Sequence, residues 1–422
     1  MILKNLRRVK VSNLLSFNDK SQEIFFTAEN KYSSSKFDYI ESETRKQDKI
    51  LPVTLLYGAN ASGKTNFIDV FGRIGSLLKR VGLKDNEKNL PYMPFDGSKA
   101  PVCMEVEFVL NDQIYLYIVE YDSSEIHKEV FCSLNSNNSL RKLYERNDKK
   151  ISFHSMSGIS AGVKKEIRER LSTRRDVSVL EILKIRNIEQ YAEGYDFLTS
   201  LNNDLGIARL KLLFDDVALR KEVVKCLKYA DVGITDMHIE KYDDGFRKKM
   251  LSAFSKMDME GIELSEDVFY FASFSHRGIN KKIKAGLESS GTKKFIDILT
   301  YILPMFFKTG GVYISDEIER SLHPLLVKKI IEMFHDKRIN KCGAQLIATT
   351  HEISLLAPDV LSRDEIWFVE KDYQCGNSIV YPLSSFKDIR SSFDYRSGYL
   401  DGLFGGIPYL GSVDNLIKQL KG

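Results

Sequence analysis

The sequence predicts an α/β protein in which a mostly parallel sheet flanked by helices carries an N-terminal antiparallel β subdomain and an inserted helical lobe. Three observations predict this fold. Residues 51–71 have the pattern of a strand, a glycine-rich loop and a helix. Residues from about 126 to 265 are charged and periodic in the manner of helices. After residue 266, short β-rich runs alternate with helical patterns, which is typical of a parallel sheet covered by helices.

The chain is expected to divide into three parts, 1–125, 126–265 and 266–422, of which the first and third form one domain. In the first part, alternation from Cys103 to Tyr121 indicates a hairpin that turns at Asn111 and Asp112. The Ser- and Lys-rich segment 29–49 is expected to be a loop. The helical part has two apolar stripes, at Ile159, Val163, Ile167 and Leu171 and at Leu180, Leu183, Ile188 and Tyr191. The β-rich runs of the third part are VFYFASF, GVYISD, AQLIATT and EIWFVEK.

Composition indicates a cytoplasmic globular protein. The 422 residues exceed the size of a single core, and the net charge of +4 is too small to indicate a nucleic-acid partner by itself. Five cysteines without a C-x-x-C pair are typical of free thiols in a reducing compartment. The N-terminus lacks the apolar run of a signal peptide. Residues 298–307 are too short to cross a membrane and predict a buried helix, so no membrane partner is expected.

The strongest functional signal is the loop from Gly58 to Thr65, which matches G-x-x-x-x-G-K-[ST] between a strand and a helix. Glycines allow backbone N–H groups to surround a phosphate, and the following helix adds its positive end. Lys64 is expected to reach the outer phosphates of ATP and Thr65 to hold Mg²⁺ through its hydroxyl. A glycine turn without a ligand is the alternative. The predicted nucleotide-binding residues of the loop are Gly58, Asn60, Ala61, Ser62, Gly63, Lys64, Thr65 and Asn66.

Two later strands end in residues suited to nucleotide hydrolysis. The run Gly311 to Ser315 precedes Asp316 and Glu317, which is the pattern of an Mg²⁺-directing aspartate beside a carboxylate that polarises water. Caps of the following helix are the alternative for these acids. A third strand ends at His351, and a histidine in that place is either structural or catalytic. We therefore expect Thr65 and Asp316 at the metal, and Glu317 and His351 as catalytic residues.

A second anion site is predicted at Ser289, Ser290 and Gly291, where small and hydroxyl residues begin an apolar helix. Together with the loop at Gly58, this segment and its surroundings resemble ABC-type ATPases of the SMC and OLD groups. The segments that carry the resemblance are Glu288–Thr292, Asp316–Glu317, Ser321–Pro324, His351 and Gly405–Pro408. Their particular forms, ESSGT, DEIERSLHP, ATTHE and GGIP, are most similar to ATPases of bacterial anti-phage and abortive-infection systems, such as the ATPase subunit of the PARIS system.

The resemblance implies an ATP-sandwich dimer, or a larger homo-oligomer built from such dimers. In it, Ser289 and Gly291 would face the γ-phosphate held by the partner, Leu322 and His323 would lie in the D-loop, and His351 would be the switch histidine. The sequence departs from the usual signature at Ser290, where glycine is commoner, and at Thr292, where glutamine or glutamate is commoner. No Q-loop glutamine is found, since Gln113 lies at the hairpin turn and the expected region reads MPFD at 93–96. Slow hydrolysis is one expected consequence.

Two functions remain open on the sequence. The first is an ATPase that acts as sensor or scaffold of an anti-phage system and controls a separate toxin or nuclease through ATP-dependent assembly. Because the chain stops soon after the GGIP element, we expect no OLD-type nuclease domain and an effector that acts in trans. The second is an ATPase subunit of a DNA-processing or DNA-repair complex. Basic clusters at 164–165, 174–175 and 281–282 could contact nucleic acid, although a solvated helix face is the commoner meaning of such clusters.

Overall fold

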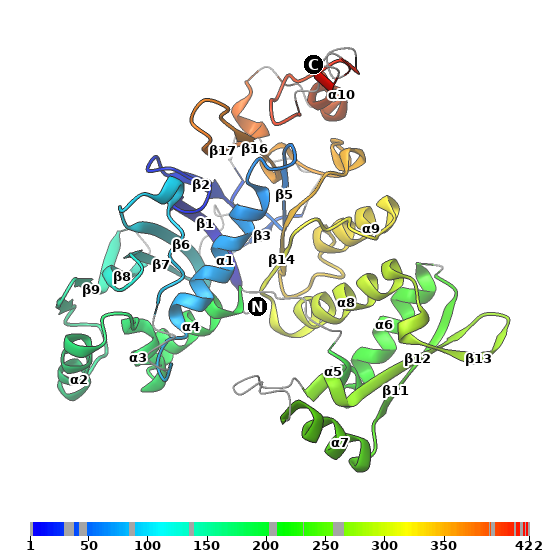
Figure 1. Cartoon of the computed structure of the whole chain (residues 1–422), viewed down its shortest axis with the longest axis horizontal. Coiled ribbons are helices and arrows are strands. Elements are labelled where there is room, and N and C mark those ends of the chain that lie inside the picture. The colour runs from blue at the N-terminus through cyan, green and yellow to red at the C-terminus, as the bar shows by residue number, and fades with distance from the viewer. Residues whose placement is uncertain are drawn as a thin grey trace.

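The computed structural model covers the whole chain, and Figure 1 shows the course of its helices and strands. Two bodies lie to either side of a central sheet: helices and strands α1–α4 and β6–β10 on one side, and α5–α9 with β11–β13 on the other. The structure describes residues 3–28, 38–41, 49–83, 89–134, 139–201, 209–230, 232–255, 266–387, 389, 393–408, 411–413, 417 and 419–420.

A seven-stranded antiparallel sheet forms the N-terminal body, in the order β10-β9-β8-β7-β6-β1-β2. The predicted hairpin is confirmed: β6 and β7 pair from Val102 with Tyr121 to Leu110 with Gln113, and Asn111 and Asp112 turn between them with φ of 49° and 65°. The strands of this sheet are β1 (Lys4–Ser12), β2 (Gln22–Phe25), β6 (Val102–Leu110), β7 (Gln113–Tyr121), β8 (Ile126–Leu134), β9 (Leu140–Asn147) and β10 (Lys150–Phe153).

The central sheet has five strands in the order β14-β15-β5-β16-β17. Its first four strands are parallel, and β17 is antiparallel to β16. Every residue of β5 is buried, Thr54 included, as expected for a parallel strand that is covered on both faces. Because parallel strands end at one edge, the residues after β5, β14 and β15 meet there. These strands are β5 (Val53–Tyr57), β14 (Val312–Ser315), β15 (Gln345–Thr349), β16 (Ile366–Lys371) and β17 (Ser378–Pro382).

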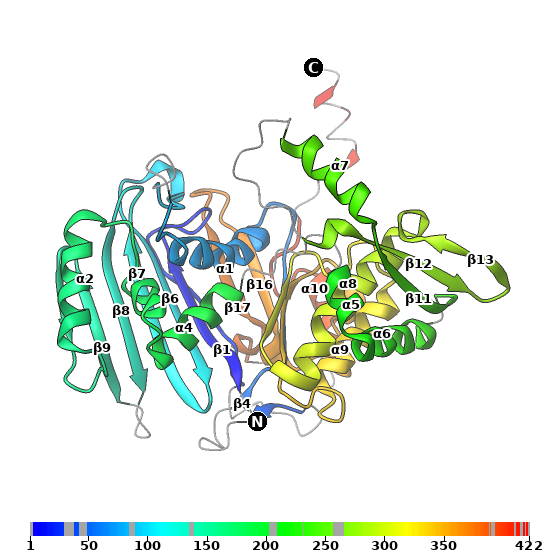
Figure 2. The ribbon, with the colours of Figure 1, turned by 90° about the horizontal axis from the view of Figure 1, so that it is seen from below.

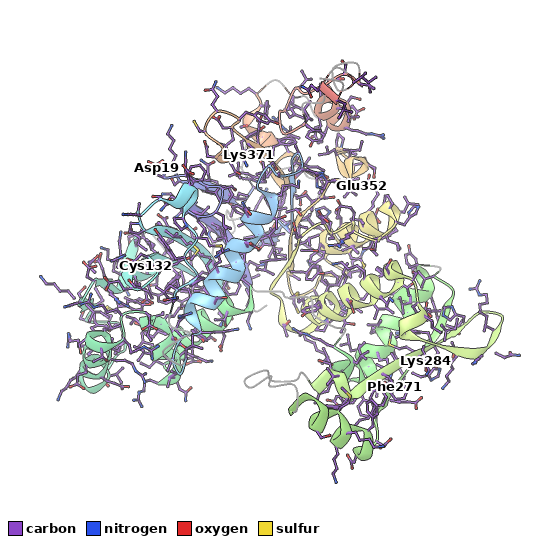
Figure 3. All side chains as sticks on the ribbon, in the orientation of Figure 1. Asp19, Cys132, Phe271, Lys284, Glu352 and Lys371 are labelled. Carbon is purple, nitrogen blue, oxygen red and sulfur yellow. The ribbon has the colours of Figure 1, made fainter. Side chains whose placement is uncertain are left out.

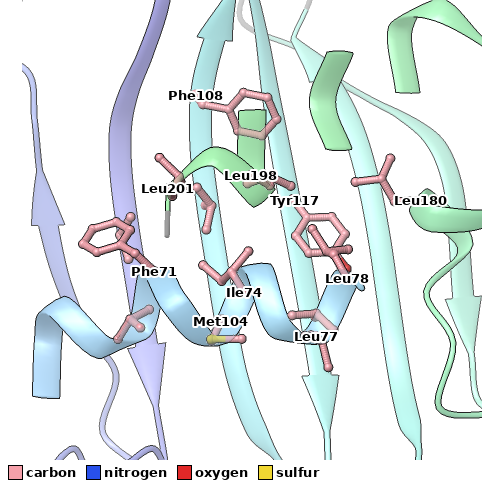
Figure 4. Packing of buried hydrophobic residues seen from close by; sticks show 14 of the residues in the cluster. Phe71, Ile74, Leu77, Leu78, Met104, Phe108, Tyr117, Leu180, Leu198 and Leu201 are labelled. Carbon is pink, nitrogen blue, oxygen red and sulfur yellow. The ribbon is translucent and has the colours of Figure 1, made fainter. Parts of the chain in front are cut away.

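Helix α1 (Lys64–Leu78) lies across the antiparallel sheet and fills the core between the two sheets. Its apolar face, which includes Phe71, Ile74 and Leu77, packs with Met104 and Tyr117 of the sheet (Figure 4). Helices α3 and α4 close the same core. The helices on this body are α2 (Ala161–Thr173), α3 (Val179–Ile185) and α4 (Glu189–Ser200). A second core lies on the opposite face of the central sheet, around α8 (Ser290–Pro304) and α9 (Pro324–His335).

The predicted start of the helical lobe at residue 126 is wrong. Residues 126–153 form β8, β9 and β10 of the antiparallel sheet, and the first helix of the region begins at Ala161. The charge that suggested a solvated helix has a structural use. Glu129 of β8 is fully buried and accepts hydrogen bonds from the hydroxyls of Tyr144 at 2.8 Å and Ser178 at 2.6 Å. A carboxylate can occupy a core position in place of an apolar residue when hydrogen-bond donors compensate for its loss of hydration.

A smaller lobe follows α4 and contains α5 (Leu210–Asp215), α6 (Val217–Tyr229), α7 (Asp244–Ser255) and a three-stranded antiparallel sheet. The strands of that sheet are β11 (Ile234–Lys241), β12 (Tyr270–His276) and β13 (Ile279–Lys284). The run VFYFASF, expected in the parallel sheet, supplies β12 instead. A short apolar strand has no sequence feature that distinguishes these two environments.

The apolar run 298–307 is a buried helical segment as predicted, since α8 and the π-helical turn Met305–Thr309 bury Ile298, Leu299 and Phe306. The described part of the chain contains no helix with the length and apolar character that a membrane crossing requires. The predicted loop 29–49 lies largely outside the described residues. Within it, short strands β3 (Ile40–Glu41) and β4 (Lys49–Ile50) pair with each other. The last described helix is α10 (Tyr395–Leu400).

Candidate nucleotide-binding site

The phosphate loop connects β5 to α1, and its two glycines are required by their surroundings. Gly63 has φ of 110°, and a Cβ on it would lie 2.2 Å from the hydroxyl of Ser378. A Cβ on Gly58 would lie 2.3 Å from the carbonyl oxygen of Val369. Distances this short exclude any side chain at either position. The loop is therefore held closely between α1 and strands β16 and β17.

Lys64 is buried beneath the loop. Its Nζ donates to the carbonyl oxygens of Gly58 at 2.9 Å and Ala59 at 3.0 Å. Burial lowers the pKa of Lys64, and the nearby Asp316, Glu317 and Glu319 oppose that shift. The ammonium group is thus bound to weak acceptors that a phosphate would replace with full negative charges.

The N-terminus of α1 has the features of an anion-binding site. The first turn of α1 contains no acidic residue, and Gly63 provides no side-chain cap. The first N–H groups of a helix lack partners inside the helix, and the helix dipole favours negative charge beside them. The hydroxyl of Ser62 is also buried without a hydrogen-bond partner among the described residues. These donors fit the phosphates of a nucleotide.

Thr65, Asp316 and Thr349 form one hydrogen-bonded group at the ends of β5, β14 and β15. Thr65 Oγ1 donates to Asp316 Oδ2 at 2.9 Å, and Thr349 Oγ1 donates to Asp316 Oδ1 at 2.5 Å. The structure thus brings together the two predicted metal ligands. A hydroxyl and a carboxylate fit Mg²⁺, which keeps several waters and takes its remaining ligands from phosphates. The described residues contain no group of three or more His, Cys, Asp or Glu side chains placed to hold a metal by themselves.

Glu317 lies beside this group in an unusual backbone conformation. Its φ is 46°, and its N–H donates to Thr349 Oγ1 at 2.7 Å. Residues other than glycine rarely have a positive φ of this size. Residues held in such strained backbone conformations are frequent at functional sites. The Glu317 carboxylate makes no hydrogen bond to any residue that the structure describes, so it is available to a water molecule in front of a phosphate.

His351 follows β15 at the same edge, as predicted, and its side chain is exposed. Burial and Lys64 lower the pKa of His351, while Glu319, Glu317 and Asp316 act in the opposite direction. The shift favours the neutral form of the imidazole. A neutral ring provides both a donor and an acceptor nitrogen.

Glu319 is a residue of the candidate site that the sequence reasoning missed. Its Oε1 accepts a hydrogen bond of 2.6 Å from the backbone N–H of His351, and its Oε2 is buried without a partner among the described residues. A third acid two positions after Glu317 is visible in the sequence. The contact of Glu319 with His351 is not visible in the sequence, because it arises only when strands β14 and β15 pair in the sheet.

The predicted second anion site is the N-terminus of α8. Ser289 caps the helix, with its Oγ accepting from the N–H of Thr292 at 3.0 Å, and Ser290 is its exposed first residue. A Cβ on Gly291 would lie 2.5 Å from the carbonyl oxygen of Ser321, so the glycine also permits close packing against the segment after β14. Among the described residues, no hydrogen bond joins this segment to the phosphate loop of the same chain.

Gln113 has no place in this site. Its Nε2 donates to the carbonyl oxygens of Ile114 and Leu134, within the antiparallel sheet. The predicted absence of a Q-loop glutamine stays a prediction, since no contact with a metal is shown for residues 93–96.

The phosphate loop, the buried lysine and the Thr65–Asp316 pair beside a parallel sheet have the arrangement of a phosphate-loop nucleotide-binding site. Residues 53–357 match the family described as "AAA domain, putative AbiEii toxin, Type IV TA system", and the chain belongs to that family. None of the curated proteins matches the chain.

Among solved structures, the chain is similar to SMC head domains. The SMC head domain from Thermotoga maritima is 15% identical with a TM-score of 0.41, over 90% of this chain and 98% of that one. An Smc head with an extended coiled coil, bound to the C-terminal domain of ScpA derived from Pyrococcus furiosus, is 13% identical with a TM-score of 0.42, over 90% and 96%. The SmcHead bound to the C-winged helix domain of ScpA is 14% identical with a TM-score of 0.41, over 89% and 97%.

Proposed function

We propose that the protein binds ATP with Mg²⁺ in this site and hydrolyses it. The observation that carries the proposal is the group formed by Lys64, Thr65 and Asp316, because a buried ammonium, a hydroxyl and a carboxylate converge at the positive end of α1. When bound, Mg²⁺ would neutralise charge on the β- and γ-phosphates. Lys64 would leave the carbonyl oxygens of Gly58 and Ala59 and bind the outer phosphates.

In this mechanism Glu317 orients a water molecule and accepts its proton as the water attacks the γ-phosphorus. The bond from that phosphorus to the β–γ bridging oxygen breaks, and ADP is the leaving group. The free carboxylate of Glu317 and its fixed backbone support that role. His351 would hydrogen-bond the γ-phosphate from the opposite side with a neutral ring. Glu319 holds the backbone of His351 and so sets the position of that ring.

The site is proposed to be completed by a second copy of the chain. The N-terminus of α8 offers N–H groups and the Ser289 hydroxyl to an anion, yet no hydrogen bond connects it to the phosphate loop of its own chain in the described residues. An isologous pair would place Ser289, Ser290 and Gly291 of each protomer against the nucleotide of the other. Larger homo-oligomers would be built from such pairs.

The biological role that we propose is control of a separate toxin or nuclease in a bacterial anti-phage system. The family description names a putative AbiEii toxin of a type IV TA system, and the segments ESSGT, DEIERSLHP and ATTHE resemble defence ATPases such as the one of the PARIS system. The alternative role is that of an ATPase subunit in a DNA-processing or repair complex. A pull-down from the native host, with identification of the co-purified proteins, distinguishes an effector from repair factors.

The ATP site is tested by Lys64→Ala in isothermal titration calorimetry with MgATP. We expect binding to be lost while the thermal unfolding curve is unchanged, because Lys64 serves the ligand. The matched control is Lys79→Ala, which removes an exposed lysine at the other end of α1. Wild-type affinity in Lys64→Ala would overturn the proposal.

A further inference from the structure

A basic groove lies on the small lobe, between α6 and the sheet β11-β12-β13. Its volume is about 550 Å³. Figure 2 shows α6 beside β11, with the β12–β13 hairpin projecting at the edge of the molecule. The groove is lined by more cations than anions. The cations are Arg220, Lys221, Lys225, Lys228 and Lys282, and the anions are Asp236 and Glu240.

The amphipathic pattern of α6 produces one wall of the groove. Leu219, Val223 and Leu227 are buried against the second core. Lys221, Lys225 and Lys228 are spaced by four and three residues, so they share a different face of the helix. All three are exposed. The three lysines therefore form a row of positive charges along one face of α6, with about one helical turn between neighbours.

Most of this charge is not neutralised by the protein. Lys221, Lys228 and Lys282 form no ion pair with any described residue. Lys225 pairs with Glu222 at 2.7 Å, but both are exposed, and such pairs contribute little. Asp236 is already engaged, since its Oδ1 accepts from the N–H of Met237.

Strand β13 extends the positive surface beyond the groove. Lys281 and Lys284 are exposed on either side of Lys282 and Ile283. Figure 3 shows Lys284 on this lobe, far from α1. The predicted basic pair at 281–282 is thus on a strand rather than a helix, and of its two residues only Lys282 lines the groove together with the lysines of α6. By contrast, the pair at 174–175 is neutralised, as Arg174 binds Asp176 and Arg175 binds Glu125.

We propose that this groove binds the sugar–phosphate backbone of a nucleic acid. Lysine ammonium groups are point charges that attract phosphates without reading bases. Among the described residues that line the groove there is no Phe, Tyr or Trp ring for base stacking, and the imidazole of His238 is hydrogen-bonded to Ser275. The groove would therefore give affinity without sequence preference. An acidic peptide added to the edge of β11 would place its side chains beside Asp236 and Glu240, whereas a phosphate chain can follow α6.

The groove is separate from the ATP site, but the groove helix α6 packs with α8, a helix of the ATP site. Helix α6 packs in the same core as Ile298, Leu299 and Ile302 of α8, and α8 begins at the segment predicted to face the partner's nucleotide. The binding proposal does not require ATP hydrolysis, so it can be tested with nucleotide-free protein.

The test is fluorescence anisotropy with a short labelled DNA duplex, single-stranded DNA and RNA, each titrated at several KCl concentrations. The variant is Lys221→Glu, Lys225→Glu and Lys228→Glu combined. We expect affinity to fall at least tenfold for all sequences, and the slope of log K against log salt on duplex DNA to fall by about two to three, since each phosphate contact contributes about 0.9. The probe that the wild-type protein binds most tightly identifies the preferred nucleic acid.

The matched control reverses three cations of α2, with Lys164→Glu, Lys165→Glu and Arg168→Glu. It changes net charge equally and should retain nearly all binding. Equal losses in the two triple variants, or an unchanged salt slope in the α6 variant, would overturn the proposal. Displacement of the probe by polyglutamate at equal charge concentration would also overturn it in favour of an acidic protein segment. If the α6 variant fails to fold, Lys282→Glu tests the same groove from β13.

Discussion

Thr65 and Asp316 lie 251 residues apart in the chain and share a hydrogen bond of 2.9 Å. The contact exists because β5 and β14 both pair with β15 in one parallel sheet, so their carboxyl ends reach the same edge. The bond joins the two side chains that we assign to Mg²⁺.

Thr65→Ala should reduce the effect of Mg²⁺ on ATP affinity. Loss of the hydroxyl removes one ligand, and the affinity measured with Mg²⁺ should fall about tenfold or more, whereas affinity in EDTA should change little. Calorimetry in the two buffers measures both values. Thr65→Ser retains the hydroxyl and serves as the control. Equal losses in the two buffers would show that Thr65 acts on the loop structure and not on the metal.

Glu317→Gln should bind ATP and hydrolyse it slowly. The amide retains the shape of the side chain but accepts no proton, and general-base catalysis contributes about 100-fold or more. Phosphate release under single-turnover conditions measures the rate, and gel filtration with ATP should show a longer-lived oligomer. Wild-type turnover would assign Glu317 a structural role and leave His351 as the main catalytic candidate.

Glu319 is expected to act by position. Glu319→Gln keeps an oxygen that can accept the N–H of His351, whereas Glu319→Ala removes it. We therefore expect Ala to lower kcat by about tenfold with little change in KM, and Gln to retain most of the activity, since the lost interaction is one hydrogen bond to a charged group. If Gln and Ala are equally impaired, the charge of Glu319 matters and its role is electrostatic.

A mixture of Lys64→Ala and Ser289→Arg chains should regain activity that neither variant has alone. Each mixed pair contains one intact site, because the intact loop of one chain meets the intact α8 N-terminus of the other. With random pairing, about half of the pairs are mixed, so recovery reaches at most roughly a quarter of the wild-type rate. Hydrolysis by Ser289→Arg alone, under conditions where it is monomeric, would remove Ser289 from the site.

Asp297→Asn should stabilise the protein at alkaline pH. Burial raises the pKa of Asp297 to about 6, against an opposing effect of Lys294. Between the unfolded value near 3.8 and the folded value, the folded state binds more protons, so the wild-type stability falls as pH rises through that range. The variant should therefore gain on the order of 1 kcal/mol over wild type between pH 5 and pH 8 in urea unfolding. If the stability difference between the variant and wild type is the same at pH 5 and at pH 8, the pKa of Asp297 is not raised.

The candidate ATP site could be predicted where the residues of each motif are adjacent in the sequence. The loop from Gly58 to Thr65, the pair Asp316–Glu317 and the strand end at His351 each carry their function in adjacent residues, since one strand end presents one or two side chains. The start of the helical lobe was misread, because Glu129 looks like a surface charge until the hydroxyls of Tyr144 and Ser178 are placed around it.

The sequence by itself therefore determined the class of fold, the phosphate loop and the order of the strand-end residues, because local periodicity and backbone requirements are encoded within a few positions. Only the tertiary structure decided that Glu319 holds His351, that Ser378 closes on Gly63, and that Lys282 of β13 lines one groove with the lysines of α6. These relationships depend on which strands pair and which helices pack, and that choice is made by burial of surfaces far apart in the chain.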